Sequence, residues 1–395
     1  MSVSTVHLPK SIFYGEGSFK KIGEEASKLG KKALIISDHV MEQLGNLEKC
    51  HVYLREAGVE FVDYLDVASE PTDEYVYQAL ALTKDECCDV VIALGGGSCI
   101  DTAKAVAVLA TNGRDISDFM NLKTLATVNP LPLITIPTTA GTGSEATDVT
   151  VITNTSNDVK MMIKQPAFMP EIAIVDPVLT ISSPKNTTAA TGIDALTHAL
   201  EAYISKKAHP FTDHMALSAI KLITENILDA YHNGSNVEAR NNMIYGAMQA
   251  GIAFSNSSVC LVHGMSRPLG ALFHVPHGIS NAMLLPSVLE YTKSSCIPRL
   301  AELASYLYPD LKGFSQIDLA NKLVKNILKL CQELNIPNIK TWGVDREAFE
   351  QVLGKMAKDA LDSGSPANNP KVPDENDIIS LYRHAFTFEY ELKKV

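Results

Sequence analysis

The chain of 395 residues lacks the features that mark membrane, secreted and nucleic-acid-binding proteins. No stretch approaches the roughly 18 consecutive apolar residues of a membrane span. The first ten residues lack the basic and then apolar layout of a secretion signal. The 34 lysines and arginines form no cluster suited to phosphates, and the net charge is −11. We therefore expect a protein that has neither a membrane nor a nucleic acid as its partner.

Cysteine is scarce, and its spacing shows no pairing. The chain has seven cysteines, an odd number, which in a chain of this size indicates reduced thiols. We therefore expect a cytoplasmic location. Apolar residues make up 46% of the chain and charged residues 20%, which is typical of a globular protein with room for two or three domains.

Short apolar runs alternate with helical spacing over the first 180 residues. Runs typical of strands cover residues 32–37, 60–64, 89–94, 133–136 and 172–175, and helical spacing covers 18–29, 73–87 and 98–110. This alternation predicts an α/β domain with a mainly parallel sheet. The strand signal fades after Pro177, and the chain then has helical spacing. We expect an α/β domain at residues 1–182 and an all-α domain at residues 183–395.

Two loops that follow expected strands have the composition of an anion-binding site. The first loop ends the strand at 89–94 and opens a helix through Asp101; it consists of Gly95, Gly96, Gly97 and Ser98. Glycines let backbone amides approach a pyrophosphate at the helix N-terminus, although three glycines alone are more often a tight turn. The second loop offers hydroxyl groups from Thr138, Thr139, Thr142 and Ser144. Together the loops predict a Rossmann-like dinucleotide-binding domain.

Asp38 lies at the end of the expected strand 32–37. A carboxylate at this position can accept hydrogen bonds from an adenosine ribose, and it would repel a 2′-phosphate. Aspartate is also a favoured N-cap of helices, and both roles can hold at once. The sign of the charge predicts NAD rather than NADP as the coenzyme.

One aspartate and three histidines form the most informative pattern of the chain. Asp194 and His198 are one helical turn apart, and His263 and His277 follow downstream. One carboxylate and three imidazoles suit a borderline divalent cation such as Fe²⁺ or Zn²⁺. Each position alone has an ordinary alternative: a solvated or hydrogen-bonded pair for Asp194 and His198, a core histidine for His263, and a helix cap for His277.

These motifs, in this order and spacing, resemble those of the iron-dependent (group III) alcohol dehydrogenases over nearly the whole chain. The matching segments are residues 95–98 with Asp101 and Lys104, then 137–145, 189–203, 261–265 and 275–278. The branch that the chain most resembles contains the lactaldehyde reductases and propane-1,3-diol dehydrogenases. The resemblance implies a dehydroquinate synthase-like fold and a homodimer or larger homo-oligomer.

The resemblance also implies site residues. It implies that Asp194, His198, His263 and His277 bind Fe²⁺, with Zn²⁺ as the alternative. It assigns both loops to the coenzyme, here NAD, and adds Val151 and Lys160 near the ribose and nicotinamide. The implied activity is hydride transfer between NAD(H) and a small primary alcohol, diol or aldehyde. The alternatives are a dehydrogenase of the same fold that acts on glycerol or on a hydroxy or oxo acid, and a non-catalytic NAD- or metal-sensing relative.

Two positions depart from the family pattern. Cys99 replaces a proline, and Arg267 replaces a histidine that is often given a proton-relay role. Arginine stays protonated at physiological pH and cannot act as a general base. We therefore expect His274, the only other histidine close in sequence to a ligand, to be the catalytic relay. For Arg267, we expect a carboxylate, the coenzyme pyrophosphate, or an anionic or polyhydroxylated substrate as its partner.

Overall fold

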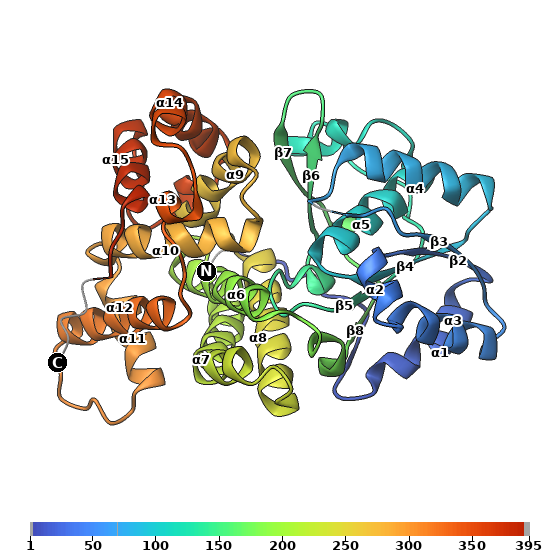
Figure 1. The fold of residues 1–395 in the computed structure, drawn as a ribbon, viewed down its shortest axis with the longest axis horizontal. Helices are drawn as coiled ribbons and strands as arrows, with labels where there is room; N and C mark the ends of the chain where they lie inside the picture. Colours follow the sequence, from blue (N-terminus) through green and yellow to red (C-terminus); the bar gives the residue numbers. More distant parts are fainter. Residues whose placement is uncertain (1–2, 69, 391–395) are drawn as a thin grey trace.

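The computed structural model describes residues 3–68 and 70–390. The chain forms two parts that lie side by side: one contains the strands, and the other is helical (Figure 1). Within the described residues, no helix is long and apolar enough to cross a membrane.

The first part contains a parallel sheet, an antiparallel hairpin and the helices around them. Its strands are β1 (Ser11–Tyr14), β2 (Lys32–Ile36), β3 (Glu60–Tyr64), β4 (Val90–Gly95), β5 (Leu133–Pro137), β6 (Val149–Asn154), β7 (Val159–Lys164) and β8 (Ile172–Val175). Its α-helices are α1 (Lys21–Leu29), α2 (His39–Gln43), α3 (Asn46–Glu56), α4 (Asp73–Asp85) and α5 (Gly97–Asn112).

The sheet has the strand order β1-β8-β5-β4-β2-β3, and its strands pair in parallel. The chain runs outward from β2 to β3 and then crosses back to β4 and β5 on the other side. The order therefore reverses between β2 and β4. Ligands of open parallel sheets bind outside the carboxyl ends of the strands at such a point. Asp38 follows β2 and Gly96 follows β4, so both lie at this position.

Helices cover both faces of the sheet, and successive residues of β2 show why. Ala33 and Ile35 pack into the core that contains residues of α1 and α3. Leu34 and Ile36 pack into the core that contains residues of α4 and α5. Because side chains alternate between the faces of a strand, a strand covered on both faces needs a continuous apolar run. The expected mainly parallel sheet is confirmed.

The strands expected from the apolar runs are present as β2, β3, β4, β5 and β8, and the expected helices are present as α1, α4 and α5. The sequence patterns missed β1, the β6–β7 hairpin, α2 and α3. The hairpin has lysines and threonines between its apolar residues, and its two strands pair with each other rather than with the sheet. It therefore lacks the apolar run of the central strands.

The second part is helical, as expected. Its helices are α6 (Lys185–Ile204), α7 (Pro210–His232), α8 (Val237–Asn256), α9 (Leu261–Phe273), α10 (His277–Lys293), α11 (Ile297–Leu307), α12 (Gln316–Glu333), α13 (Ile339–Trp342), α14 (Arg346–Asp362) and α15 (Glu375–Phe386). The change in architecture falls between β8 and α6; the domain boundary at 182/183 itself stays a prediction.

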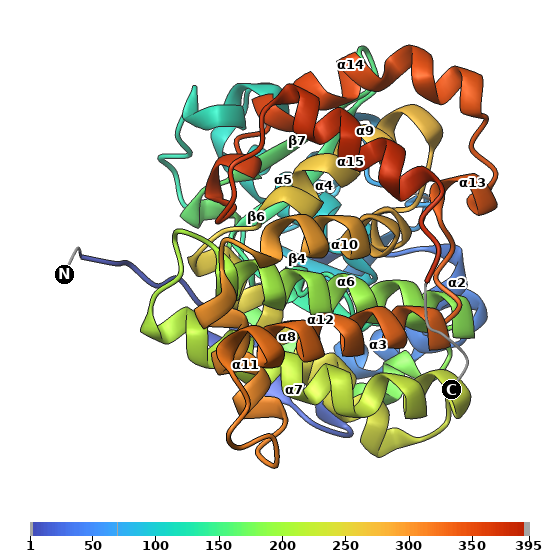
Figure 2. The same cartoon turned by 90° about the vertical axis from the view of Figure 1, so that its left-hand side faces the viewer.

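Helix α6 lies at the centre of the helical part and packs against α7, α8 and α10 (Figure 2). Nearly all of its residues from Thr188 onward are buried. At Gly192 a Cβ atom would lie 2.6 Å from Cδ1 of Ile227 on α7, so the close approach of the two helices depends on this glycine. Polar side chains on α6 are consequently held in a rigid, water-excluded setting.

Buried polar side chains fix the loop between β5 and β6 to α5. The ammonium group of Lys104 donates hydrogen bonds to Ser144 Oγ at 2.8 Å, Thr147 Oγ1 at 2.9 Å and the Val149 carbonyl at 2.7 Å. Asp101 accepts hydrogen bonds from Ser144 Oγ at 2.6 Å and from the Val151 amide at 2.9 Å. These contacts hold the second expected coenzyme loop against the helix that the first loop opens.

The same loop buries the carboxyl group of Glu145. Burial raises the pKa of Glu145 from 4.5 to about 7, against the smaller opposing effects of its own backbone amide and Lys104. The folded protein therefore holds a proton that the unfolded chain releases between these pH values. This contribution to stability is fully present below pH 4.5 and is lost as the pH rises through 7.

We expect Glu145→Gln, which mimics the protonated form, to remove this pH dependence. At about 1.4 kcal/mol per pKa unit, the variant should be more stable than the wild type by about 3 kcal/mol at pH 8 and by far less at pH 5. Chemical unfolding of both proteins at the two pH values measures the difference. Glu225→Gln, at an exposed position of α7, is the matched control. Equal differences at both pH values would contradict the assignment.

Candidate metal and coenzyme site

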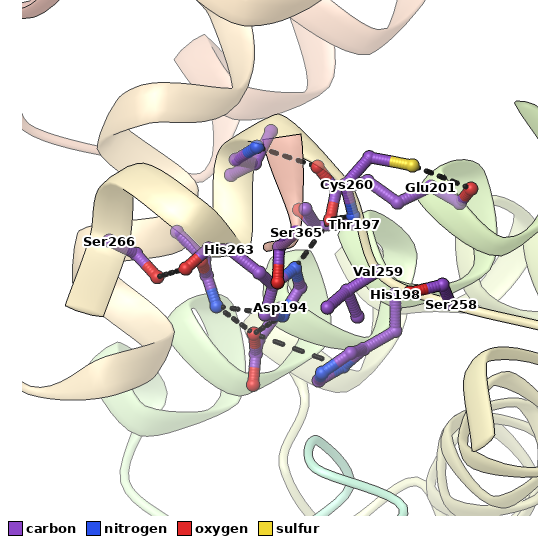
Figure 3. Close-up of polar contacts among 12 residues, drawn as sticks. Asp194, Thr197, His198, Glu201, Ser258, Val259, Cys260, His263, Ser266 and Ser365 are labelled. Carbon is purple, nitrogen blue, oxygen red and sulfur yellow. Dashed lines mark hydrogen bonds and ion pairs between the residues drawn. The ribbon is translucent and has the colours of Figure 1, made fainter. Parts of the chain in front are cut away.

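Four side chains with metal-binding atoms converge in the helical part. Asp194 and His198 come from α6, His263 from α9, and His277 from the first position of α10. Asp194 Oδ1 lies 3.9 Å from His198 Nδ1, 3.7 Å from His263 Nε2 and 3.9 Å from His277 Nε2. One ligand atom of each residue lies within 4.8 Å of those of the others. Figure 3 shows Asp194, His198 and His263 pointing toward one another.

The charge states of Asp194, His198 and His277 suit a cation. Burial would raise the pKa of Asp194, but the three imidazoles outweigh it and lower this pKa, so the carboxylate stays ionised. Burial lowers the pKa of His198 well below its usual value and the pKa of His277 to about 4, which keeps both imidazoles neutral. Neutral imidazoles have a free lone pair for a metal.

Glu201 fixes the orientation of His263, and the sequence patterns did not single it out. Its Oε2 lies 2.7 Å from His263 Nδ1 and accepts a hydrogen bond from the Cys260 amide at 2.8 Å, and its Oε1 accepts one from the Val262 amide at 2.6 Å. A proton assigned to Nδ1 leaves the Nε2 lone pair directed at the cluster. The signal was available, because Asp194, His198 and Glu201 have i, i+4, i+7 spacing on α6.

Asn281 completes the cluster from α10, one turn after His277. Its amide nitrogen lies 2.6 Å from Asp194 Oδ1, 3.1 Å from His263 Nε2 and 3.2 Å from His277 Nε2. Within the described residues, the buried Nδ1 of His198 has no hydrogen-bond partner. Donors that share a cation at about 2.0–2.2 Å lie about 3–4 Å apart, which agrees with the 3.7–3.9 Å between Asp194 Oδ1 and the three imidazole nitrogens. The residues therefore fit a divalent cation.

Glu70 connects the two parts of the protein beside the cluster. Its carboxylate accepts hydrogen bonds from the His277 amide at 3.1 Å and from Lys160 Nζ at 3.0 Å. Burial would raise the pKa of Glu70, but Lys160 and His277 outweigh it and lower this pKa. A carboxylate at the N-terminus of α10 also interacts favourably with the helix dipole. No sequence pattern pointed to Glu70.

Three adjoining cavities follow the cleft between the two parts. The outer cavity, about 640 Å³, and the inner cavity, about 300 Å³, share Glu70, Gly96, Ser98, Lys160 and Pro276 in their walls. The inner cavity shares His198, Phe254 and His277 with a third cavity of about 270 Å³. The cluster of Asp194 and the three histidines thus lies at the junction of the inner and third cavities.

Most of the expected coenzyme residues line the outer and inner cavities. They are Asp38, Gly96, Gly97, Ser98, Asp101, Thr139, Thr142, Ser144, Val151 and Lys160. Gly95 and Thr138 do not line them; they lie behind the loops, where the Thr138 amide donates a hydrogen bond to the Gly95 carbonyl at 3.0 Å. At Gly97 a Cβ atom would lie 2.7 Å from Thr142 Cγ2, so this glycine lets the two loops meet.

Asp38 and His274 lie in the wall of the outer cavity. Asp38 Oδ1 accepts a hydrogen bond from the Met41 amide at 2.9 Å, which confirms its role as the N-cap of α2. Its contact with a ribose stays a prediction. His274 is exposed and ends α9 in the left-handed conformation, with φ 52°. It is absent from the walls of the two cavities that contain the metal-binding atoms.

Arg267 is buried, with 8% of its surface exposed, and lies in the wall of the third cavity together with His263. Its Nη1 donates a hydrogen bond to Ser365 Oγ at 3.0 Å, and its Nη2 lies 3.0 Å from the Met162 sulfur. Arg267 forms no salt bridge with the described residues, because none of their carboxylate oxygens lies within 4.0 Å of its guanidinium nitrogens. Of the partners that the sequence left open for Arg267, a described protein carboxylate is therefore excluded.

Comparison with known proteins agrees with this geometry. Residues 9–177 match the family model of the iron-containing alcohol dehydrogenases, and residues 188–386 match the model of the C-terminal part of the same family. The chain is 39% identical to the 1,3-propanediol dehydrogenase of Klebsiella pneumoniae over 96% of this chain and 98% of that protein. It is 35% identical to the NAD-dependent methanol dehydrogenase of Bacillus methanolicus over 96% and 98% of the two chains.

A solved structure of a 1,3-propanediol oxidoreductase superposes on this fold with a TM-score of 0.93 at 38% identity, covering 98% of this chain and all of that one. The expected fold class and resemblance are confirmed. The described cluster, the two glycine-containing loops and the matches over both parts lead to one conclusion: the chain belongs to the iron-containing alcohol dehydrogenase family.

Proposed function

We propose that this protein is a metal-dependent, NAD-dependent alcohol dehydrogenase or aldehyde reductase that acts on small molecules. The observation that carries the proposal is the position of the four metal-binding side chains at the junction of the inner and third cavities. The relatives named 1,3-propanediol dehydrogenase and NAD-dependent methanol dehydrogenase support it. We propose Fe²⁺ as the cation, from the family, although the same donors also suit Zn²⁺.

Asp194, His198, His263 and His277 would hold the cation. When bound, the cation supplies a Lewis acid for a substrate oxygen, and NAD(H) supplies or accepts the hydride. The chain contributes position and electrostatics. Glu201 holds the ring of His263, and Phe254 stacks on His198 with ring centroids 4.4 Å apart. Both contacts restrict the imidazoles to one orientation.

We further propose that the loops after β4 and β5 bind the coenzyme through Gly96, Gly97, Ser98, Thr139 and Thr142. The amides at the start of α5 are suited to a pyrophosphate because they lie at a helix N-terminus. Val151 and Lys160, on the β6–β7 hairpin, line the inner cavity and would lie near the ribose and nicotinamide. Asp38, in the outer cavity, would contact the adenosine ribose.

Two expectations about setting belong to the same proposal. We infer a reducing compartment, the cytoplasm, because all seven cysteines are free thiols and six of them are buried. We infer a homodimer or larger homo-oligomer from the family resemblance. Measurement of the protein's mass in solution tests this assembly.

The first prediction concerns the metal-binding residues. We expect His263→Ala and His277→Ala to lose bound metal and to lower NADH-dependent reduction of short aldehydes by more than about 100-fold, because each removes a donor. Glu201→Gln should weaken metal affinity by about 10- to 100-fold through His263. Metal analysis of anaerobically purified protein, paired with turnover, measures both. His214→Ala, at an exposed position, is the control. Full metal content and turnover in the histidine variants would refute the ligand assignment.

The second prediction concerns coenzyme choice. Asp38→Asn keeps an oxygen to cap α2 but removes the charge that would face a 2′-phosphate. We expect the ratio of kcat/KM for NADPH to that for NADH to rise about tenfold, which corresponds to about 1.4 kcal/mol. Asp66→Asn, at an exposed position outside the cavity wall, should leave the ratio unchanged. An unaltered ratio in Asp38→Asn would leave Asp38 as a helix cap alone.

The third prediction concerns the proton. We propose that it reaches solvent through the ribose hydroxyl and His274 at the outer cavity. If so, His274→Ala should remove one ionisation from the pH profile of kcat/KM, while metal content stays at the wild-type level. The double variant with His274→Ala and Arg267→His tests whether a histidine at position 267, as in the family, restores the missing ionisation. A pH profile of His274→Ala that matches the wild type means that His274 only terminates α9.

A further inference from the structure

We propose that the third cavity is a subsite for an anionic group, and that the substrate is a short aldehyde or alcohol with an acidic group at the end away from the reacting carbon. This inference rests on the proposed function and adds the substrate class to it. Arg267 is the residue that would bind the anion. The shared chemistry is a carboxylate or a sulfonate on a chain of a few carbons.

The first observation is that the guanidinium of Arg267 forms no salt bridge with a described residue. Arg267 is 92% buried, yet within the described residues its partners are one hydroxyl group, of Ser365, and one thioether, of Met162. A guanidinium has five N–H donors and keeps its charge at neutral pH, even though burial lowers the pKa of Arg267 to about 10. A buried cation is costly unless an anion neutralises it.

The second observation is that neither Glu201 nor the coenzyme pyrophosphate is placed to bind the guanidinium of Arg267. Glu201 is the carboxylate whose charge acts on Arg267, but its oxygens already contact the amides of Cys260 and Val262 and the ring of His263. The coenzyme pyrophosphate is excluded by position, because Arg267 does not line the outer or the inner cavity. A ligand in the third cavity remains. Of the two expected kinds of substrate, an anionic one would neutralise the guanidinium, whereas a polyhydroxylated one would not.

The third observation is the composition of the cavity. Its described wall contains the side chains of Arg267, Lys164 and Lys207 but no aspartate or glutamate. Lys164 is paired with Asp148 at 2.5 Å, whereas exposed Lys207 has no carboxylate within 4.0 Å among the described residues. The hydroxyl oxygen of Ser365 accepts a hydrogen bond from Arg267, so its own proton is available to a ligand. The polar part of the wall therefore offers donors and positive charge, beside the apolar side chains of Val149, Val151, Phe254 and Val259.

The fourth observation joins this subsite to the reaction. Arg267 follows His263 by one turn of α9, so the two side chains share a helix face. His198, His263 and His277 line the same cavity as Arg267. The volume of about 270 Å³ lies at the small end of ligand cavities, so a short molecule could contact the metal-binding cluster at one end and Arg267 at the other. Figure 3 shows Ser365, the partner of Arg267, in the same view as Asp194 and His263.

The experiment compares matched aldehydes in the metal-loaded enzyme with NADH. We expect kcat/KM for 4-oxobutanoate to exceed that for butanal by at least about tenfold, with sulfoacetaldehyde against propanal as the sulfonate pair. In Arg267→Met, kcat/KM for the anionic substrates should fall by about 10- to 100-fold, as expected for loss of a charge-assisted hydrogen bond, and that for butanal by less than about threefold. Arg267→Lys should recover part of the loss, since it restores charge but not the planar fork.

Controls separate this subsite from general electrostatics. Lys207→Met removes an exposed charge from the same wall and should have a smaller effect that high salt abolishes. Calorimetric titration of the NAD-loaded holoenzyme with butanoate and with butanamide measures binding apart from turnover. Wild type should bind butanoate more tightly, and Arg267→Met should bind the two equally. Because a carboxylate could instead bind the metal, unchanged butanoate affinity in Arg267→Met would overturn the subsite.

The outcomes distinguish the two proposals. If butanal is reduced well and the anionic aldehydes are no better, or if Arg267→Met affects both classes equally, the anion subsite is wrong and the dehydrogenase proposal stands. If no aldehyde is reduced by metal-loaded protein, the dehydrogenase proposal itself fails. If Arg267→Met does not fold, wild-type binding decides: tighter binding of butanamide than of butanoate would refute the subsite.

Discussion

A buried, ionised carboxylate is the constraint on which the helical part depends. Asp194 is 1% exposed and lies on the most buried helix of the domain, with three imidazoles around it. Such a charge is costly in a protein interior unless a cation or several hydrogen bonds compensate it. Asn281 supplies one hydrogen bond, and Glu201 adds a second negative charge nearby. A divalent cation among these residues would offset both carboxylates at the point where α6, α9 and α10 meet.

The cleft between the two parts places different cavities on the two sides of the cluster. The parallel sheet opens its carboxyl ends, with Asp38 and Gly96, toward one side of the cluster, and the β6–β7 hairpin extends over it. Glu70 ties the hairpin residue Lys160 to the start of α10. Arg267 faces the third cavity, on the other side of the shared histidines. The coenzyme and the substrate would therefore reach the metal-binding atoms from different cavities.

The sequence predicted those parts of the fold in which the spacing of apolar or polar residues indicates which side chains are buried together. The doubly covered strands, such as β4, are continuous apolar runs, and Asp194 and His198 follow the i, i+4 spacing of a helix. The β6–β7 hairpin and α2 have no such pattern, because the hairpin strands pair with each other outside the central sheet and α2 is only five residues long. The same holds for Glu70 and Asn281, whose roles come from tertiary contacts with α10 and with the cluster. For Arg267 the sequence left three partners open, and only the folded chain shows that no carboxylate of the described residues pairs with it.

The central claim is that Asp194 and the three histidines hold one divalent cation. Anomalous X-ray diffraction at the iron and zinc edges, from crystals of anaerobically purified protein, tests it most directly. The account predicts a single peak at the junction of the inner and third cavities, about 2.0–2.3 Å from an oxygen of Asp194 and from one nitrogen each of His198, His263 and His277. A fully active preparation with no peak at this position, or with its metal bound elsewhere, would contradict the account.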